Sequence, residues 1–140
     1  MKISARNQIA GKVKTVQEGA VNAVVTICRE HHNPIKADIT MAAVKDLGLE
    51  EGKECYAVIK ATSVMFATEK LPQLSARNQI EGTVVAVKEG AVNGSVTLED
   101  PYGDKFTGSI TNAAIEELGL EVGKPAVAII KATDVMVAID

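Results

Sequence analysis

Short apolar runs separated by polar turns follow one another along the chain, and the same order of runs occurs twice. In the first half, residues 9–16 alternate apolar with small or charged side chains, and residues 21–29 are rich in β-branched residues. Both patterns are typical of strands, because branched side chains suit a pleated surface. The polar, proline-containing stretch 29–34 then predicts a hairpin loop, and the alternating residues 35–39 predict a short third strand.

A helix and a buried strand are predicted next. Thr40 has the side chain of an N-cap, residues 41–47 suit a short helix, and Gly48 suits its left-handed terminator. After a glycine turn, the apolar run 55–62 predicts the last buried strand, and residues 63–67 predict a short extension of it.

The second half of the chain repeats the first. The two copies align without a gap over 66 positions, of which 34 are identical. The segment 69–74 contains Pro72 and predicts the joint between them. We therefore predict two tandem domains, residues 1–70 and residues 71–140, referred to below as the first and second repeats.

Each repeat is predicted to be a small barrel. Five short strands with one small helix in about 70 residues favour an OB-type architecture. The predicted fold is thus mainly β, with two tandem OB-type small β-barrels and one short helix in each. A barrel of this size has little core of its own, so tandem fusion and oligomerisation would both stabilise it.

Composition narrows the functional classes. Of the 140 residues, 46% are hydrophobic and 3% aromatic, and the net charge is −3, which argues against a broad nucleic-acid or anionic-membrane surface. No apolar run approaches the length of a membrane span, and the first residues lack an apolar leader segment. Cys28 and Cys55 predict buried, reduced thiols. We therefore expect a cytoplasmic protein.

The polar groups that recur in both copies are mostly hydrogen-bond donors. Lys60 and Lys131 follow buried apolar runs, where a lysine either reaches solvent or faces an anion. The strings SARNQI and EGAVN, each present twice, supply hydroxyl, guanidinium and backbone N–H groups, although both strings also suit simple turns.

The adjacent pair His31 and His32 has no counterpart in the second copy, and a solvated loop is favoured over a metal site there. No nucleophile–base set recurs. We therefore predict a binding protein rather than an enzyme, with no catalytic cofactor and no direct protein–metal ligands.

Several strings together resemble one family. SARNQI, EGAVN, the IT before the small helix, LGL followed by GK, and KAT followed by VM are similar to the Mop domain of the molbindins. The arrangement resembles the tandem, or di-Mop, molbindins. That resemblance implies cytoplasmic binding, storage and homeostasis of molybdate or tungstate, an OB-type barrel, and a trimer of two-domain chains with oxyanions at interfaces between domains.

The resemblance also implies two classes of oxyanion site. The residues implied for the first class are Ser4, Arg6, Lys60, Ala61 and Thr62 with Thr40 from a neighbouring surface, and the matching set Ser75, Arg77, Lys131, Ala132, Thr133 and Thr111. The second class would use Gly19, Ala20, Val21 and Asn22, and Gly90, Ala91, Val92 and Asn93. Because Asp134 stands where the first repeat has Ser63, the two halves are expected to differ in affinity.

Two other functions fit parts of the sequence. One is an OB-fold protein that binds single-stranded nucleic acid, which needs stacking aromatic residues and a basic groove. The other is a purely structural oligomer whose repeats only pack. The low aromatic content and the net charge of −3 disfavour the first alternative. The absence of ligand-induced stabilisation would indicate the second.

Overall fold

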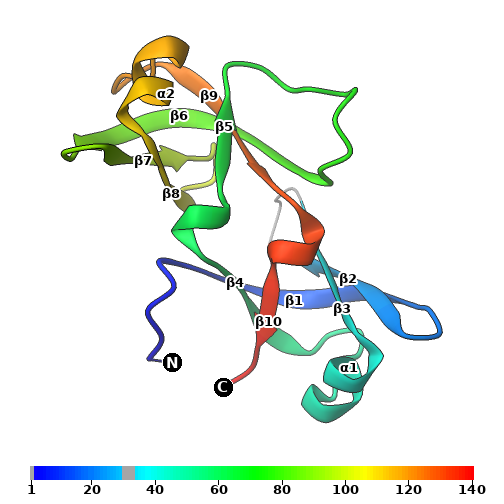
Figure 1. Cartoon of the computed structure of the whole chain (residues 1–140). Coiled ribbons are helices and arrows are strands. Elements are labelled where there is room, and N and C mark those ends of the chain that lie inside the picture. Colours follow the sequence, from blue (N-terminus) through cyan, green and yellow to red (C-terminus); the bar gives the residue numbers. More distant parts are fainter. Residues whose placement is uncertain (1, 30–33) are drawn as a thin grey trace. The chain divides into compact units, whose positions relative to one another are not determined.

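The computed structural model describes residues 2–29 and 34–140, and most of this part of the chain is extended in strands (Figure 1). The elements of the first repeat are β1 (Asn7–Glu18), β2 (Asn22–Cys28), β3 (Ile35–Thr40), α1 (Met41–Leu47), β4 (Glu54–Ile59), the 3₁₀ turn η1 (Ala61–Ser63) and β5 (Met65–Ala67). Those of the second repeat are β6 (Asn78–Glu89), β7 (Asn93–Glu99), β8 (Lys105–Thr111), α2 (Asn112–Leu118), β9 (Pro125–Ile130), η2 (Ala132–Asp134) and β10 (Met136–Ala138). The predicted mainly β class, with one short α-helix in each repeat, is confirmed.

Both helices begin and end at the predicted residues. The Thr40 hydroxyl accepts a hydrogen bond from the Ala43 amide at 3.1 Å, and Gly48 adopts the left-handed conformation at φ 62° that ends α1. Thr111 and Gly119 do the same for α2. A threonine N-cap satisfies one orphan amide, and glycine reaches positive φ without a Cβ penalty.

The strand predicted over residues 55–62 is shorter than expected. β4 ends at Ile59, so the prediction of a continuous strand over 55–62 is wrong at its end. The Ser63 amide donates to the Lys60 carbonyl at 2.9 Å, which turns the chain into η1 before β5 begins. The sequence run is apolar up to this point, and apolarity alone does not show where a chain turns.

Each sheet contains a strand from the other repeat. The strand orders are β10-β4-β1-β2-β3 and β5-β9-β6-β7-β8, so β5 pairs with β9, and β10 pairs with β4 (Figure 1). The chain accordingly divides into unit 1, formed by Met1–Ile59 with Lys131–Asp140, and unit 2, formed by Lys60–Ile130. These compact units differ from the sequence repeats, because the two repeats exchange their final segments.

The exchanged segments bring the edges of each sheet toward each other. In unit 1, η2 and β10 pack against β3 at the opposite edge of the sheet, and in unit 2, η1 and β5 pack against β8. A register shift between Val13 and Thr15 lets the first part of β1 pair with β4 and the second part with β2. Bulges of this kind increase strand curvature, which helps a short sheet to close.

In each unit, the exchanged strand and the strand that it contacts carry side chains of complementary size. In unit 2, a Cβ placed on Gly108 would collide with the Phe66 ring and lie 3.1 Å from the Val64 Cβ. The corresponding positions in unit 1 are Ala37 and Val137, so a larger strand residue is matched by a smaller partner. This complementarity favours the exchanged arrangement, because Phe66 against an alanine would be overpacked.

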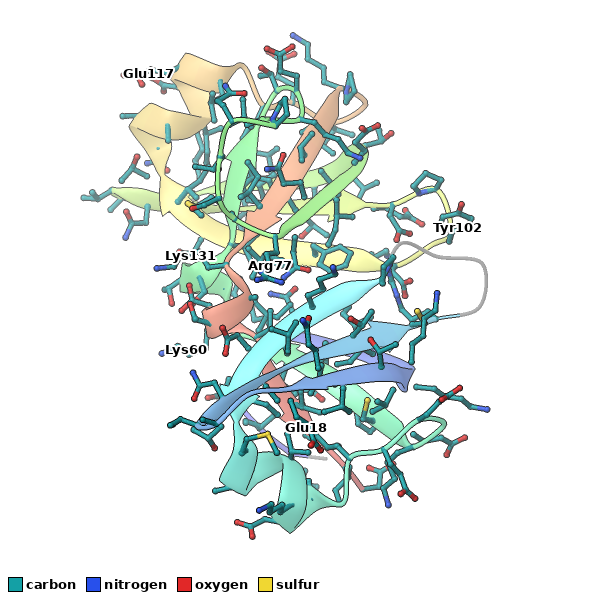
Figure 2. The ribbon with its side chains drawn as sticks, turned by 90° about the vertical axis from the view of Figure 1, so that its right-hand side faces the viewer. Glu18, Lys60, Arg77, Tyr102, Glu117 and Lys131 are labelled. Carbon is teal, nitrogen blue, oxygen red and sulfur yellow. The ribbon has the colours of Figure 1, made fainter. Side chains whose placement is uncertain are left out.

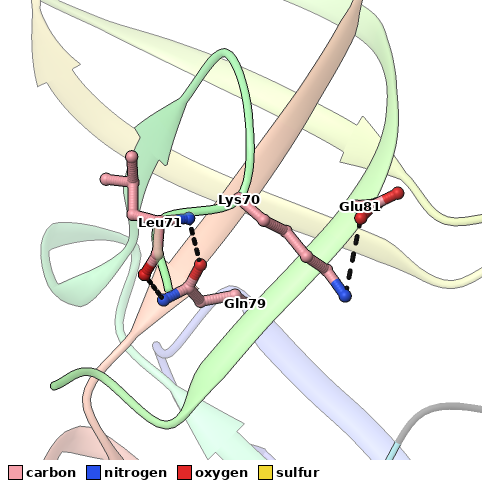
Figure 3. A network of polar contacts seen from close by, with 4 residues as sticks. All are labelled: Lys70, Leu71, Gln79 and Glu81. Carbon is pink, nitrogen blue, oxygen red and sulfur yellow. Dashed lines mark hydrogen bonds and ion pairs between the residues drawn. The ribbon is translucent and has the colours of Figure 1, made fainter. Parts of the chain in front are cut away.

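The predicted joint between the repeats is an irregular segment fastened to unit 2. The Gln79 side chain accepts from the Leu71 amide and donates to the Leu71 carbonyl, both at 2.8 Å (Figure 3). Lys70 and Glu81 form an exposed ion pair at 3.5 Å beside it, which contributes about 0–1 kcal/mol (Figure 3). Leu71 also packs against the buried residues Ala67, Val127 and Ile129. The joint is therefore held mainly by this apolar contact and by the two hydrogen bonds between the Leu71 backbone and the Gln79 side chain.

Candidate functional site

In unit 1, two of the predicted polar segments flank the same end of the sheet. β1 begins at Asn7 opposite Ile59, the last residue of β4, and β10 begins at Met136 opposite Val58. The segment before β1 contains Ser4 and Arg6, and the segment before β10 is η2. The register therefore places residues 4–6 and the KAT string of the second repeat, residues 131–133, at the same end of the sheet.

Unit 2 repeats this geometry with the segments interchanged. Asn78 lies opposite Ile130 at the end of β9, and Met65 at the start of β5 lies opposite Ile129. The corresponding end of this sheet is thus flanked by two segments. One is the string that contains Ser75 and Arg77, and the other is η1.

Most of the predicted oxyanion residues are accessible. Lys60 and Lys131, labelled in Figure 2 together with Arg77, follow the ends of β4 and β9 and are exposed. The other exposed members of the first class are Ser4, Arg6, Thr40, Thr62, Ser75, Thr111 and Thr133, whereas Ala61 is half-buried and Ala132 is buried. Cations at strand ends are solvated in this arrangement and remain available to an anion.

Asparagine within SARNQI has a structural role. Asn7 and Asn78 are 2% and 3% exposed, and the Nδ2 atom of the Asn7 side chain donates to the Ile59 carbonyl at 3.1 Å. This bond fixes the polar segment to the end of β4, beside the point where Lys60 follows in the chain. The asparagine of this string thus joins the entry of β1 to β4, whereas the serine and arginine before it are exposed.

The two capping threonines lie at the hairpin-tip end of each sheet, where Thr40 pairs with Asn22 and Thr111 pairs with Asn93. η2 packs against β3, which ends in Thr40, and η1 packs against β8, which ends in Thr111. Each threonine oxygen already accepts a helix amide, so its hydroxyl hydrogen is left to donate. Because β10 runs parallel to β3 and β5 runs parallel to β8, each KAT segment lies toward the start of the strand that it contacts, and the threonine at the end of that strand is separated from it.

The residues predicted for a second class of site form separate hairpin tips. Gly19–Asn22 joins β1 to β2, and Gly90–Asn93 joins β6 to β7, at the far ends of β1 and β6 from the SARN and KAT segments but beside Thr40 and Thr111. The Gly19 and Gly90 amides donate to Asn22 and Asn93 carbonyls at 2.9 Å. Val21 and Val92 project from these tips and are 73% and 72% exposed. The structure does not bring these tips together with the KAT segment of the same unit.

A cavity that the sequence did not indicate lies elsewhere on unit 1. Its volume is about 810 Å³, and the residues that give it chemical character are Lys12, Cys28, Arg29, Cys55, Tyr56 and Asp140. None of the residues predicted for oxyanion binding lines it. Lys12, Cys28 and Cys55 have no equivalents in the second repeat, where Thr83, Glu99 and Ala126 stand, so an ungapped repeat comparison would only have marked the region as divergent.

Two titratable groups that line this cavity have raised pKa values. The hydrogen bond from the Tyr56 hydroxyl to Asp140, at 2.9 Å, and the charge of that carboxylate raise the pKa of Tyr56. Burial raises the pKa of the Cys55 thiol, which keeps it protonated and unreactive at neutral pH. Cys55 is buried as predicted, Cys28 is half-buried, and both are free thiols.

Metal-ligand clusters and membrane helices were also sought. Among residues 2–29 and 34–140, no three His, Cys, Asp or Glu side chains are grouped as metal ligands. His31 and His32, considered above as a metal pair, lie outside the described residues. In the same described part of the chain, every helix is too short or too polar to cross a bilayer.

A sequence model of the TOBE domain matches the chain twice, at residues 3–66 and 74–137. The chain belongs to the TOBE domain family. Each TOBE match runs through the strand that is exchanged, so each compact unit combines most of one TOBE domain with the last segment of the other.

Relatives of these TOBE domains carry molybdenum in their names. "Molybdenum transport protein ModE" of Azotobacter vinelandii is 42% identical over 139 residues, covering 99% of this chain and 52% of the relative. A "probable molybdenum-pterin-binding protein" of Haemophilus influenzae is 55% identical over 69 residues, covering 49% of this chain and 100% of the relative. The chain thus spans about half the length of the ModE relative and about twice that of the smaller protein.

One solved structure resembles the whole tandem TOBE chain. It is the cytoplasmic molybdate-binding protein ModG in a form with molybdate bound. The TM-score is 0.96 at 42% sequence identity, and the alignment covers 100% of both chains. This similarity extends over both TOBE domains, including the exchanged strands.

Proposed function

We propose that this chain binds molybdate in the cytoplasm and serves its storage and homeostasis, with tungstate as a second ligand. The observation that carries the proposal is the end-to-end similarity to ModG, a protein whose structure holds molybdate. The accessible donor groups at the edge of each unit support it, because an oxyanion needs donors and a cation. The sites are the two classes described above, completed at interfaces between domains of an oligomer.

The donor set also favours one kind of oxyanion. Molybdate and tungstate are fully deprotonated dianions at neutral pH, whereas phosphate carries a proton that needs an acceptor. Lys60, Thr62 and Arg77, with their counterparts in the other repeat, offer hydrogens to such a dianion. A site of this type leaves the phosphate O–H unpaired at a cost of about 1–3 kcal/mol.

We further propose that the chain is a homo-oligomer, with three copies as the expected number. Val21 and Val92, each more than 70% exposed at the hairpin tips, support a contact surface there. Small barrels bury little apolar area by themselves, so association would stabilise them.

Molybdate is expected to raise the melting temperature of the intact chain. Ligand at about one hundred times its Kd stabilises a protein by about 2.7 kcal/mol per independent site. Thermal unfolding with molybdate, tungstate, sulfate and phosphate at matched ionic strength measures this. Molybdate and tungstate should give the larger shifts, sulfate a smaller one because of its size, and phosphate little. Equal shifts with phosphate and molybdate would contradict the proposal.

Replacement of Lys60 or Lys131 by methionine should weaken molybdate binding by about 1.5–3 kcal/mol, or roughly ten- to hundredfold. Methionine keeps the length of the stem and removes only the charge-assisted bond, so the stability of the unliganded protein should hardly change. Calorimetric titration of each variant provides the measurement. Lys53→Met and Lys124→Met are matched controls, because these exposed lysines lie in the turns before β4 and β9. If all four variants titrate alike, the KAT lysines only reach solvent.

A further inference from the structure

The two hairpin tips have the same backbone bonds but different side-chain anchors. We call Gly19–Asn22 the first tip and Gly90–Asn93 the second tip. In each tip, the glycine amide donates to the asparagine carbonyl at 2.9 Å, and the valine carbonyl accepts from the first amide of the helix in the same repeat, at 2.7 Å from Met41 and 2.8 Å from Asn112. The second tip has a further bond, because the Asn112 Nδ2 atom donates to the Gly90 carbonyl at 2.8 Å. The methionine of the first repeat has no amide group to form it.

One atom of this anchor is left unsatisfied. The Asn112 Oδ1 atom is buried and accepts no hydrogen bond from the described residues. A flipped amide would place this oxygen against the Gly90 carbonyl, so the bond to Gly90 fixes the orientation. A Cβ on Gly94 would lie 3.0 Å from the same oxygen, whereas the first repeat has Ala23 at the corresponding place. Gly94 thus leaves the room that Asn112 needs.

The anchored carbonyl belongs to the peptide unit whose N–H group an oxyanion would use. The Gly90 carbonyl and the Ala91 amide share one plane, in which the C=O and N–H bonds point in opposite directions. A peptide unit that follows glycine rotates easily, and the bond from Asn112 restricts this rotation. Among the described residues, no group accepts a hydrogen bond from the exposed Ala91 and Val92 amides. Asn112 therefore sets the direction of a free donor at the second tip.

We propose that Asn112 is a positioning residue for the second class of oxyanion site, which preforms the second tip and leaves the first tip to order on binding. The inference rests on the proposed molybdate-binding function and adds a residue outside both repeated polar strings. A ligand that binds only one of several conformations binds more weakly by the fraction of molecules in that conformation. One net hydrogen bond changes this fraction by roughly two- to tenfold.

The experiment is an NMR titration of the full chain with sodium molybdate, in which the amide signals of Val21 and Val92 report the two tips separately. In wild type, the Val92 signal should reach its midpoint at roughly two- to tenfold less molybdate than the Val21 signal. Asn112→Met should raise the Val92 midpoint by that factor and leave the Val21 midpoint unchanged. The melting temperature without ligand should change little, because the unsatisfied oxygen is removed together with the bond. Ala113→Met, at the next and exposed position of α2, is the control and should change neither midpoint.

The reciprocal variant moves the anchor to the first tip. Met41→Asn combined with Ala23→Gly recreates the pair found in the second repeat and should lower the Val21 midpoint by roughly two- to tenfold. Lys88 stands where the first repeat has Gln17, and its charge also favours an anion at the second tip. The change that each substitution makes is therefore the decisive measurement.

The other outcomes separate failure of the inference from failure of the function. If Asn112→Met leaves the Val92 midpoint unchanged, or shifts both tips together, the inference is overturned. If the tips never respond while the Lys60 and Lys131 signals do, the inference is again overturned and the second class is removed from the proposed function. If no amide of the folded chain responds and its melting temperature stays the same, the proposed molybdate binding itself fails.

Discussion

Removal of residues 135–140 is expected to expose the backbone of β4 in unit 1 while β9 in unit 2 remains protected. The truncation deletes β10, the strand that pairs with β4, together with Val135, which is 1% exposed. Losing this buried valine, a half-buried second valine and the strand pairing should cost about 3–5 kcal/mol. That is a large part of the 5–15 kcal/mol that stabilises a typical domain. Hydrogen–deuterium exchange measured strand by strand reports the effect.

A matched change on the other exchanged strand should give the complementary result. Phe66 lies in β5, is 8% exposed and packs against Gly108 of β8. Phe66→Ala should cost about 3–5 kcal/mol and increase exchange in β8 and β9 rather than in β3 and β4. If the truncation loosened β9 and Phe66→Ala loosened β4, each repeat would hold its own last strand in solution, and the exchanged arrangement would be wrong.

Gly108→Ala is expected to destabilise the protein by about 1–3 kcal/mol, because the new methyl group would overlap the Phe66 ring. Phe66→Val in the same chain should recover much of that loss, since the pair would then match Ala37 and Val137 of unit 1. Urea unfolding of the two single variants and the double variant gives a coupling free energy. For residues in contact, values of about 0.5–3 kcal/mol are usual.

The reciprocal change in unit 1 is the control for this cycle. Val137→Phe should be tolerated only together with Ala37→Gly, which recreates the pair found in unit 2. Crossed combinations, such as Val137→Phe with Gly108→Ala, should show no rescue. Strict additivity of Gly108→Ala and Phe66→Val would contradict direct packing between these positions.

The candidate site was predictable from sequence as far as its residue types. Repetition of the KAT and SARNQI strings singled out Lys60, Lys131 and Arg77, and the structure places all three as exposed groups at strand ends or strand entries. Repetition did not separate the exposed residues of these strings from the buried ones. Asn7 is retained in the same string, yet its side chain is buried and bonded to the Ile59 carbonyl. Burial of this kind depends on the neighbouring strand, and the local string does not contain that information.

By itself, the sequence determined the elements and their boundaries wherever local chemistry decides them. Thr40 and Gly48 set the ends of α1 because a hydroxyl cap and a left-handed glycine act over three or four residues. The alternation along β2 and β3 likewise set which side chains face the core, because a strand has a period of two residues.

Only the tertiary structure decided which sheet each final strand joins, and hence which residues share a unit. β5 and β10 have the nearly identical sequences MFA and MVA, so their own patterns suit β4 and β9 equally well. The choice depends on contacts distant in sequence, such as Phe66 against Gly108, and on the turn after Lys60 that directs the chain away from β4. That choice also places Asp134 beside β3 rather than β8, because complementary packing between distant segments, and not the periodicity of either one, selects the partner.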